Sequence, residues 1–64
     1  MKTLAELREK KGISRNKLAK YTFIDVMTLY QYEKGNSIPD VVNALILAKY
    51  FDKKVNQINW KPKK

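Results

Sequence analysis

The side chains best suited to recognising a ligand lie in the segment from Val26 to Lys34. If this segment is a helix, one of its faces carries an amide, a cation and apolar groups, namely Val26, Met27, Tyr30, Gln31 and Lys34. A glutamine amide can bond N6 and N7 of adenine, and apolar groups pack on the thymine methyl. This face indicates contact with base edges. The simpler alternative is that Met27 and Tyr30 are incidental exposed apolar residues.

The residue types on which most catalytic sites depend are missing or scattered. The 64-residue chain has no His and no Cys, and it has only six Asp and Glu residues. It therefore lacks the commonest general base, any thiolate metal site and any disulfide. Asp25 and Asp40 are better explained as helix caps. We expect no enzymatic activity, no metal, no cofactor and no small-molecule ligand.

The charge balance points to a polyanionic partner. Fourteen Lys and Arg against six Asp and Glu give a formal net charge of +8. Such a charge on a small body favours nucleic acid, with double-stranded DNA the first candidate. The plain alternative is that a lysine-rich surface only confers solubility. A membrane surface is a weaker rival, because it would need an exposed helix with one basic and one strongly apolar face.

No segment resembles a membrane span or a signal peptide. The longest apolar run, Ala44–Ala48, is far too short to cross a bilayer. The first residues, Met1 to Thr3, lead directly into a charged segment. We therefore expect a soluble cytoplasmic protein with no membrane partner.

Two capped helices are predicted close together in the middle of the chain. Ser14 can cap a helix from about Arg15 to Tyr21, and Asp25 can cap one from about Val26 to Lys34. Such short helices with almost no linker must cross steeply, which is the helix-turn-helix geometry, here spanning about 14–34. We expect Leu18, Ala19, Leu29 and Tyr32 to be buried.

Three further helices complete the expected fold. Thr3 and Glu6 form a capping box for the first helix, and Gly12 can provide the left-handed residue that ends this helix. Asp40 opens a helix that continues to about Phe51, and a short helix follows around 54–57. The prediction is an all-α fold of five helices in one domain, 1–64, with a basic tail at 61–64. Residues 58–62 alternate in polarity, so a short C-terminal β element could be added.

The helix that begins after Asp40 is apolar on two sides. One stripe is expected to face the core and consists of Val41, Ala44, Leu45, Ala48 and Phe51. A second stripe, Val42, Ile46 and Tyr50, lies on another side. The remaining short helices can cover only one stripe, so the second predicts the interface of a homodimer. The alternative is that the C-terminal segment with Trp60 folds back over it.

The chain resembles the phage Cro/C1-repressor helix-turn-helix (XRE) family. The residues that carry the resemblance are Gly12–Ala19, Ile24–Gly35 and Pro39. The matched spacing covers about Leu4 to Ile58. The ending Trp60-x-Pro62 is more loosely similar to the compact cytolysin-type repressors of this family, which add a small β element.

The resemblance implies a five-helix, lambda-repressor-like domain and a role for each matched position. Val26, Met27 and Gln31 stand at base-reading positions, with Tyr30 on the same face. The resemblance implies phosphate contacts for Arg15, Lys34 and Asn36, and we also expect such contacts for Asn16 and Lys17. Arg8 and Glu33 match a buried ion pair of phage repressors, so they are expected to be structural.

Three positions depart from the family pattern. Phe23 occupies a turn position that is often Gly, where a left-handed backbone costs a residue with a side chain about 1–2 kcal/mol, so a different turn could form here. Val26 replaces a commonly polar residue, so readout by hydrogen bonds rests mainly on Gln31. Val42 and Ile46 replace residues that are usually polar, which supports the dimer prediction.

The function expected from these observations is sequence-specific DNA-binding transcription regulation. The simplest form is a repressor that binds a roughly palindromic operator as a homodimer, with helix 26–34 in the major groove. The alternative is a protein-interaction module, similar to an antitoxin or anti-repressor, with secondary DNA binding. A pure interaction module would have no reason to keep Arg15, Gln31, Lys34 and Asn36 together.

Overall fold

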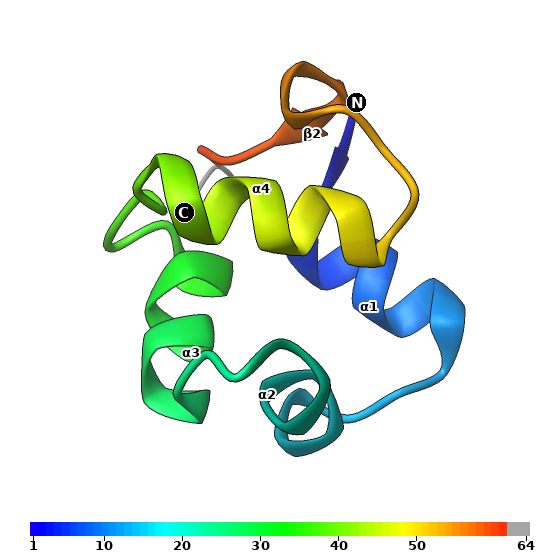
Figure 1. Cartoon of the computed structure of the whole chain (residues 1–64), viewed down its shortest axis with the longest axis vertical. Coiled ribbons are helices and arrows are strands. Elements are labelled where there is room, and N and C mark those ends of the chain that lie inside the picture. The colour runs from blue at the N-terminus through cyan, green and yellow to red at the C-terminus, as the bar shows by residue number, and fades with distance from the viewer. Residues whose placement is uncertain (62–64) are drawn as a thin grey trace.

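Four helices pack around one core in the computed structural model, which describes residues 1–61. They are, in chain order, α1 (Leu4–Lys11), α2 (Arg15–Thr22), α3 (Val26–Lys34) and α4 (Val41–Tyr50). Figure 1 shows α2 almost end-on and α3 side-on, so the two helices cross steeply as expected for a helix-turn-helix. Helix α4 runs across the molecule beside them. Within the described chain, no helix is long and apolar enough to cross a bilayer.

Each helix begins after a side chain that caps it. The hydroxyl of Ser14 accepts a hydrogen bond from the N–H of Lys17, and the Asp25 carboxylate accepts two such bonds at the start of α3. Asp40 caps α4 in the same way. At α1, Thr3 and Glu6 form the predicted capping box, and the bonds from Thr3 hold the pKa of the Glu6 carboxyl below its usual range. The predicted helix starts are therefore confirmed.

The described segment after α4 does not form a fifth α-helix. Val55–Gln57 form a single 3₁₀ turn, η1, and two short strands pair in parallel, β1 (Lys2–Thr3) and β2 (Ile58–Asn59). The expected C-terminal β element is thus present, and the five-helix, all-α prediction is corrected to four helices with a small sheet. Among the expected tail residues, Lys61 is described, while 62–64 lie outside the described residues.

The core is built from the inner faces of all four helices and the second strand. Its fully buried centre is formed by Leu18 of α2, Leu29 of α3 and Leu47 of α4. Tyr32 is also buried, as predicted, and Ala19 packs against the cluster from its edge. Burying these side chains is the main favourable contribution to the stability of so small a domain.

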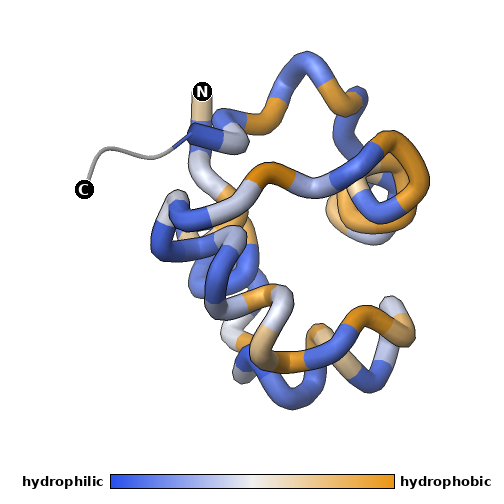
Figure 2. Tube along the Cα trace, turned by 90° about the vertical axis from the view of Figure 1, so that its left-hand side faces the viewer, coloured by the Kyte–Doolittle hydropathy of each residue, from blue (hydrophilic) through white to orange (hydrophobic). Residues whose placement is uncertain are grey.

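The predicted core face of α4 is partly wrong. Val41 and Leu45 are 74% and 55% exposed, whereas Leu47 is completely buried. Ala44, Ala48 and Phe51 are buried as expected. Figure 2 shows hydrophobic residues around much of the coil of α4, so the spacing of apolar residues did not identify the buried side. The core lies on the side of Leu47, rotated away from Val41.

The turn between α2 and α3 contains a strained aromatic residue. Phe23 has a φ of 60°, in the left-handed region, and its side chain is 96% exposed. This conformation reverses the chain so that Ile24 enters the core. The buried Thr22 hydroxyl supports the turn by donating to the Leu18 carbonyl and accepting from the Ile24 N–H. Phe23 therefore adopts the left-handed conformation despite its cost, and the different turn that this cost suggested is not found.

Replacing Phe23 with glycine should stabilise the protein. Relief of the left-handed conformation is worth about 1–2 kcal/mol, and the greater freedom of glycine in the unfolded chain offsets about 0.5–1 kcal/mol. We expect a net gain near 1 kcal/mol in the free energy of unfolding, measured by urea denaturation. Phe23→Ala is the control, because it removes the exposed ring and keeps the strained Cβ. Equal stability of the two variants would contradict the strain argument.

Candidate nucleic-acid interface

The outer face of α3 presents the side chains that the sequence singled out. Met27 and Lys34 are exposed, Val26 is partly so, and Tyr30 and Gln31 are half-buried at its centre. Since Leu29 and Tyr32 are directed into the core, the two faces of α3 have opposite roles. The structure thus brings the four predicted base-reading residues together, with Lys34 at the end of their row. We call this surface, Val26, Met27, Tyr30, Gln31 and Lys34, the α3 face.

A shallow hollow joins the α3 face to the start of α2. It has a volume of about 220 Å³ and is lined by Arg15, Val26, Met27 and Tyr30. Its walls are mostly apolar, with one guanidinium at the edge. Such a surface suits the methyl group of a thymine, while the cation suits a neighbouring phosphate.

Tyr30 holds two cations beside the α3 face. The guanidinium carbon of Arg15 lies 5.1 Å from the centre of its ring, and the Lys34 ammonium lies 5.5 Å from it. Both distances are typical of cation–π attraction. The half-buried ring therefore orders two of the predicted phosphate-binding residues.

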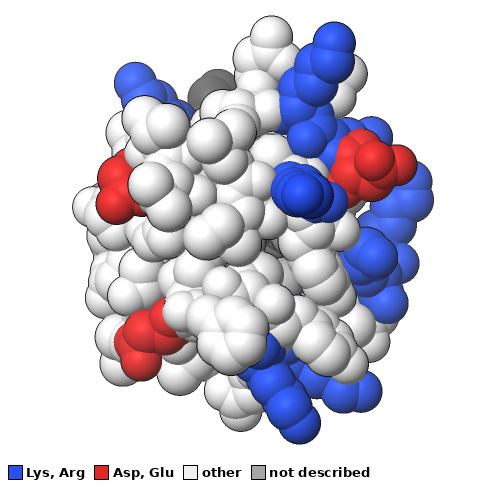
Figure 3. Space-filling view, in the orientation of Figure 1, with Lys and Arg blue, Asp and Glu red and all other residues white. Residues whose placement is uncertain are grey.

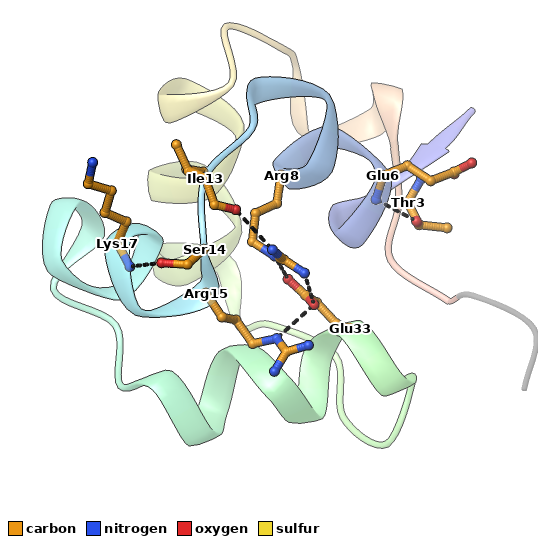
Figure 4. A network of polar contacts seen from close by, with 8 residues as sticks. All are labelled: Thr3, Glu6, Arg8, Ile13, Ser14, Arg15, Lys17 and Glu33. Atoms are coloured by element: carbon orange, nitrogen blue, oxygen red, sulfur yellow. Dashed lines mark hydrogen bonds and ion pairs between the residues drawn. The ribbon is translucent and has the colours of Figure 1, made fainter.

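A three-residue ion network of Arg8, Arg15 and Glu33 joins α1, α2 and α3 (Figure 4). Glu33 accepts from Nε and Nη2 of Arg8 at 2.7 and 3.2 Å, and from Nε of Arg15 at 2.9 Å. The Glu33 side chain is only 5% exposed, and that of Arg8 12%. Arg8 also donates from Nη1 to the Ile13 carbonyl. Its bond to Glu33 raises the pKa of the Arg8 guanidinium, so Arg8 stays charged. The predicted Arg8–Glu33 pair is confirmed.

The bond between Arg15 and Glu33 was not predicted. It fastens the first turn of α2 to α3, and only Nε of Arg15 takes part in it. Across the described residues, the Nη atoms of Arg15 make no hydrogen bond. With its side chain 36% exposed, Arg15 can donate to a phosphate without leaving Glu33.

The other predicted phosphate-binding residues lie at two ends of the same surface. Asn16 and Lys17 are exposed on the first turn of α2, beside Arg15. Asn36 is exposed just beyond α3, and its side-chain amide donates to Oε1 of Gln31 at 2.8 Å. Reasoning from the sequence missed this last contact, although Gly35 marked the turn that produces it.

The largest group of exposed apolar side chains lies elsewhere, on α4 and the loop before it. It includes Val42 and Ile46 of the predicted interface and continues over Ile38, Val41 and Leu45. We call these five residues the α4 patch. In Figure 3 a broad uncharged area covers this side of the molecule, while Lys and Arg gather along the right-hand and lower edges.

The rest of the predicted dimer stripe and the C-terminal segment border the α4 patch. Tyr50 is half-buried, with its ring stacked on Tyr21 and edge-on to Phe51. Trp60 packs against the core and donates from Nε1 to the Val55 carbonyl. An apolar hollow of about 440 Å³ lies between Trp60 and the side of the patch formed by Val41 and Leu45. The described C-terminal segment therefore leaves Val42 and Ile46 exposed.

The fold and the α3 face are those of a helix-turn-helix protein. A family model described as Helix-turn-helix matches residues 4–58. The chain belongs to this family, in its Cro/C1-type (XRE) form, whose members are DNA-binding transcription regulators. No curated protein and no solved structure gives a significant match. The predicted resemblance and its span are confirmed, and the looser one to cytolysin-type repressors stays a prediction.

Proposed function

We propose that the protein is a repressor that binds a roughly palindromic operator as a homodimer, with α3 in the major groove. The observation that supports this most strongly is the composition of the α3 face, where Gln31 is flanked by apolar groups and by cations. No catalytic step is included, and blocking a promoter by occupying it would be sufficient for repression. Cofactors and small ligands have no role in the proposal.

The placement of the phosphate-binding residues supports the same docking. Arg15, Asn16 and Lys17 lie at the start of α2, while Lys34 and Asn36 lie at the far end of α3. A helix inserted in the major groove passes between two sugar-phosphate backbones. Contacts at both ends of the α3 face would fix the register, and the residues between them would read bases.

The α4 patch supports the homodimer. A second copy is the simplest partner, because burial of an uncharged, apolar surface between identical chains leaves no charge unpaired. A core this small also gains from association. Two-fold symmetry would place the second α3 about 34 Å away, one helical turn along the DNA. The alternative is that the patch binds a different protein, as in an interaction module with secondary DNA binding.

Gln31→Ala tests whether the α3 face reads bases. We expect a loss of about 1–3 kcal/mol in operator binding, together with relaxed preference at one base pair in each half-site. Fluorescence anisotropy on duplexes that carry each base pair at each position measures both effects. If the variant keeps the discrimination of the wild type at every position, Gln31 does not read a base.

Arg15→Ala should have a different signature. Loss of a phosphate contact weakens binding to all duplexes about equally and reduces the slope of log K against log salt concentration by about 1. Glu33 keeps its bonds to Arg8 in this variant, so the fold should be retained. An unchanged salt slope would show that Arg15 serves only the ion network.

A further inference from the structure

The turn that follows α3 places Asn36 beside the last turn of the helix. Gly35 has a φ of 77°, and its N–H donates to the Tyr32 carbonyl at 3.1 Å. The N–H of Asn36 donates to the Gln31 carbonyl at 3.0 Å. These two bonds form a Schellman motif. The motif fixes the backbone of Asn36 next to the last turn of α3.

The Asn36 side chain makes a second bond to the same glutamine. Its Nδ2 donates to Oε1 of Gln31 at 2.8 Å. Since the backbone is already fixed, this bond has to order only side-chain torsions, which lowers its entropic cost. The Gln31 carboxamide is therefore held with its oxygen toward Asn36.

The direction of this carboxamide decides what Gln31 can recognise. A glutamine carries an acceptor oxygen and a donor NH₂ group, and a half-turn of its last torsion exchanges them. A freely rotating Gln31 could present either group to a base. With Oε1 turned toward Asn36, Nε2 is the polar atom of this carboxamide that lacks a partner among the described residues, so it is the group best placed to meet a ligand.

We propose that Asn36 is a positioning residue that makes Gln31 a hydrogen-bond donor to DNA. The proposal rests on the function proposed above, because it concerns the same surface. The preferred partners are major-groove acceptors, namely N7 of adenine, N7 and O6 of guanine or O4 of thymine, and the N4 donor of cytosine is disfavoured. The second Nδ2 hydrogen of Asn36 remains free for the phosphate contact that the family resemblance implied.

Two substitutions at Asn36 separate positioning from phosphate binding. Operators are selected from random duplexes, and the position at which Gln31→Ala relaxes preference is then tested with all four base pairs. Asn36→Ala should reduce discrimination there by about 2- to 10-fold, the effect of one neutral hydrogen bond. Asn36→Asp should shift preference toward cytosine, because a carboxylate accepts from Nε2 and turns Oε1 outward. The control is Ser37→Ala, an exposed neighbour whose change should leave all preferences intact.

The outcomes distinguish this proposal from the proposed function itself. If Asn36→Ala weakens binding to all duplexes equally and keeps the discrimination between base pairs, the positioning role of Asn36 is overturned. Asn36 would then make only a phosphate contact. If the wild type has no sequence preference, the proposed function fails first. In the protein without DNA, nuclear Overhauser contacts between the Asn36 side-chain amide and the Gln31 side chain are expected. Their absence would also overturn the positioning role.

Discussion

Glu33→Gln should cost the protein about 3 kcal/mol in the free energy of unfolding. The substitution keeps the size of the side chain and removes its charge, so the Arg8 guanidinium, on a side chain only 12% exposed, loses its counter-charge. Arg15, whose side chain is more exposed, is screened by water and adds little to the loss. For a domain of this size the midpoint of thermal unfolding should fall by about 12–24 °C. Trp60, the single tryptophan, and far-ultraviolet circular dichroism can both follow the transition.

Two comparisons show whether the unpaired charge is the cause. Glu9→Gln makes the same chemical change at an exposed position of α1 and should be nearly neutral. The double variant Arg8→Met/Glu33→Leu removes both charges and should recover most of the lost stability. If Glu33→Gln costs no more than Glu9→Gln, the ion network does not hold α1, α2 and α3 together.

Ile46→Glu should produce a monomer with greatly reduced affinity for the operator. A charge buried in an apolar interface has no partner, so the two copies separate. Because a dimer engages both half-sites at once, operator affinity should fall by about 100-fold or more, while affinity for a single half-site stays nearly constant. Sedimentation velocity measures the association, and fluorescence anisotropy measures the binding.

Two further variants support this test. Val42→Glu places the charge in the first turn of α4, where it suits the helix dipole, so it keeps the prediction testable if Ile46→Glu unfolds. Lys10→Gln lowers the net charge by the same single unit at an exposed position of α1 and should leave the dimer intact. A dimer that persists in both glutamate variants would move the interface away from the α4 patch.

Features set by a few neighbouring residues could be predicted from the sequence. Thr3, Ser14, Asp25 and Asp40 each begin a helix, because a cap depends on one side chain and the next three backbone N–H groups. The prediction of which α3 residues face outward and which face the core was also correct. There, Leu29 and Tyr32 share one side of the helix, whereas Gln31 and Lys34 lie on the other.

Features set by packing between distant segments could not be predicted. Almost every position of α4 is apolar, so only the arrangement of the other helices selects Leu47 for the core and leaves Val41 outside. The pairing of Lys2–Thr3 with Ile58–Asn59 involves strands of two residues, too short for a periodic signal. The bond from Arg15 to Glu33 spans 18 residues, and nothing in the spacing marks it.

Sequence-specific recognition by the α3 face is tested most directly by comparing binding of the wild type to three duplexes over a range of salt concentrations. They are a selected operator, a single half-site and a scrambled sequence of equal length. We expect two chains per operator and an affinity about 10³-fold or more above that for the scrambled duplex at physiological salt. Equal affinity for the three duplexes at every salt concentration would contradict sequence-specific recognition by the α3 face.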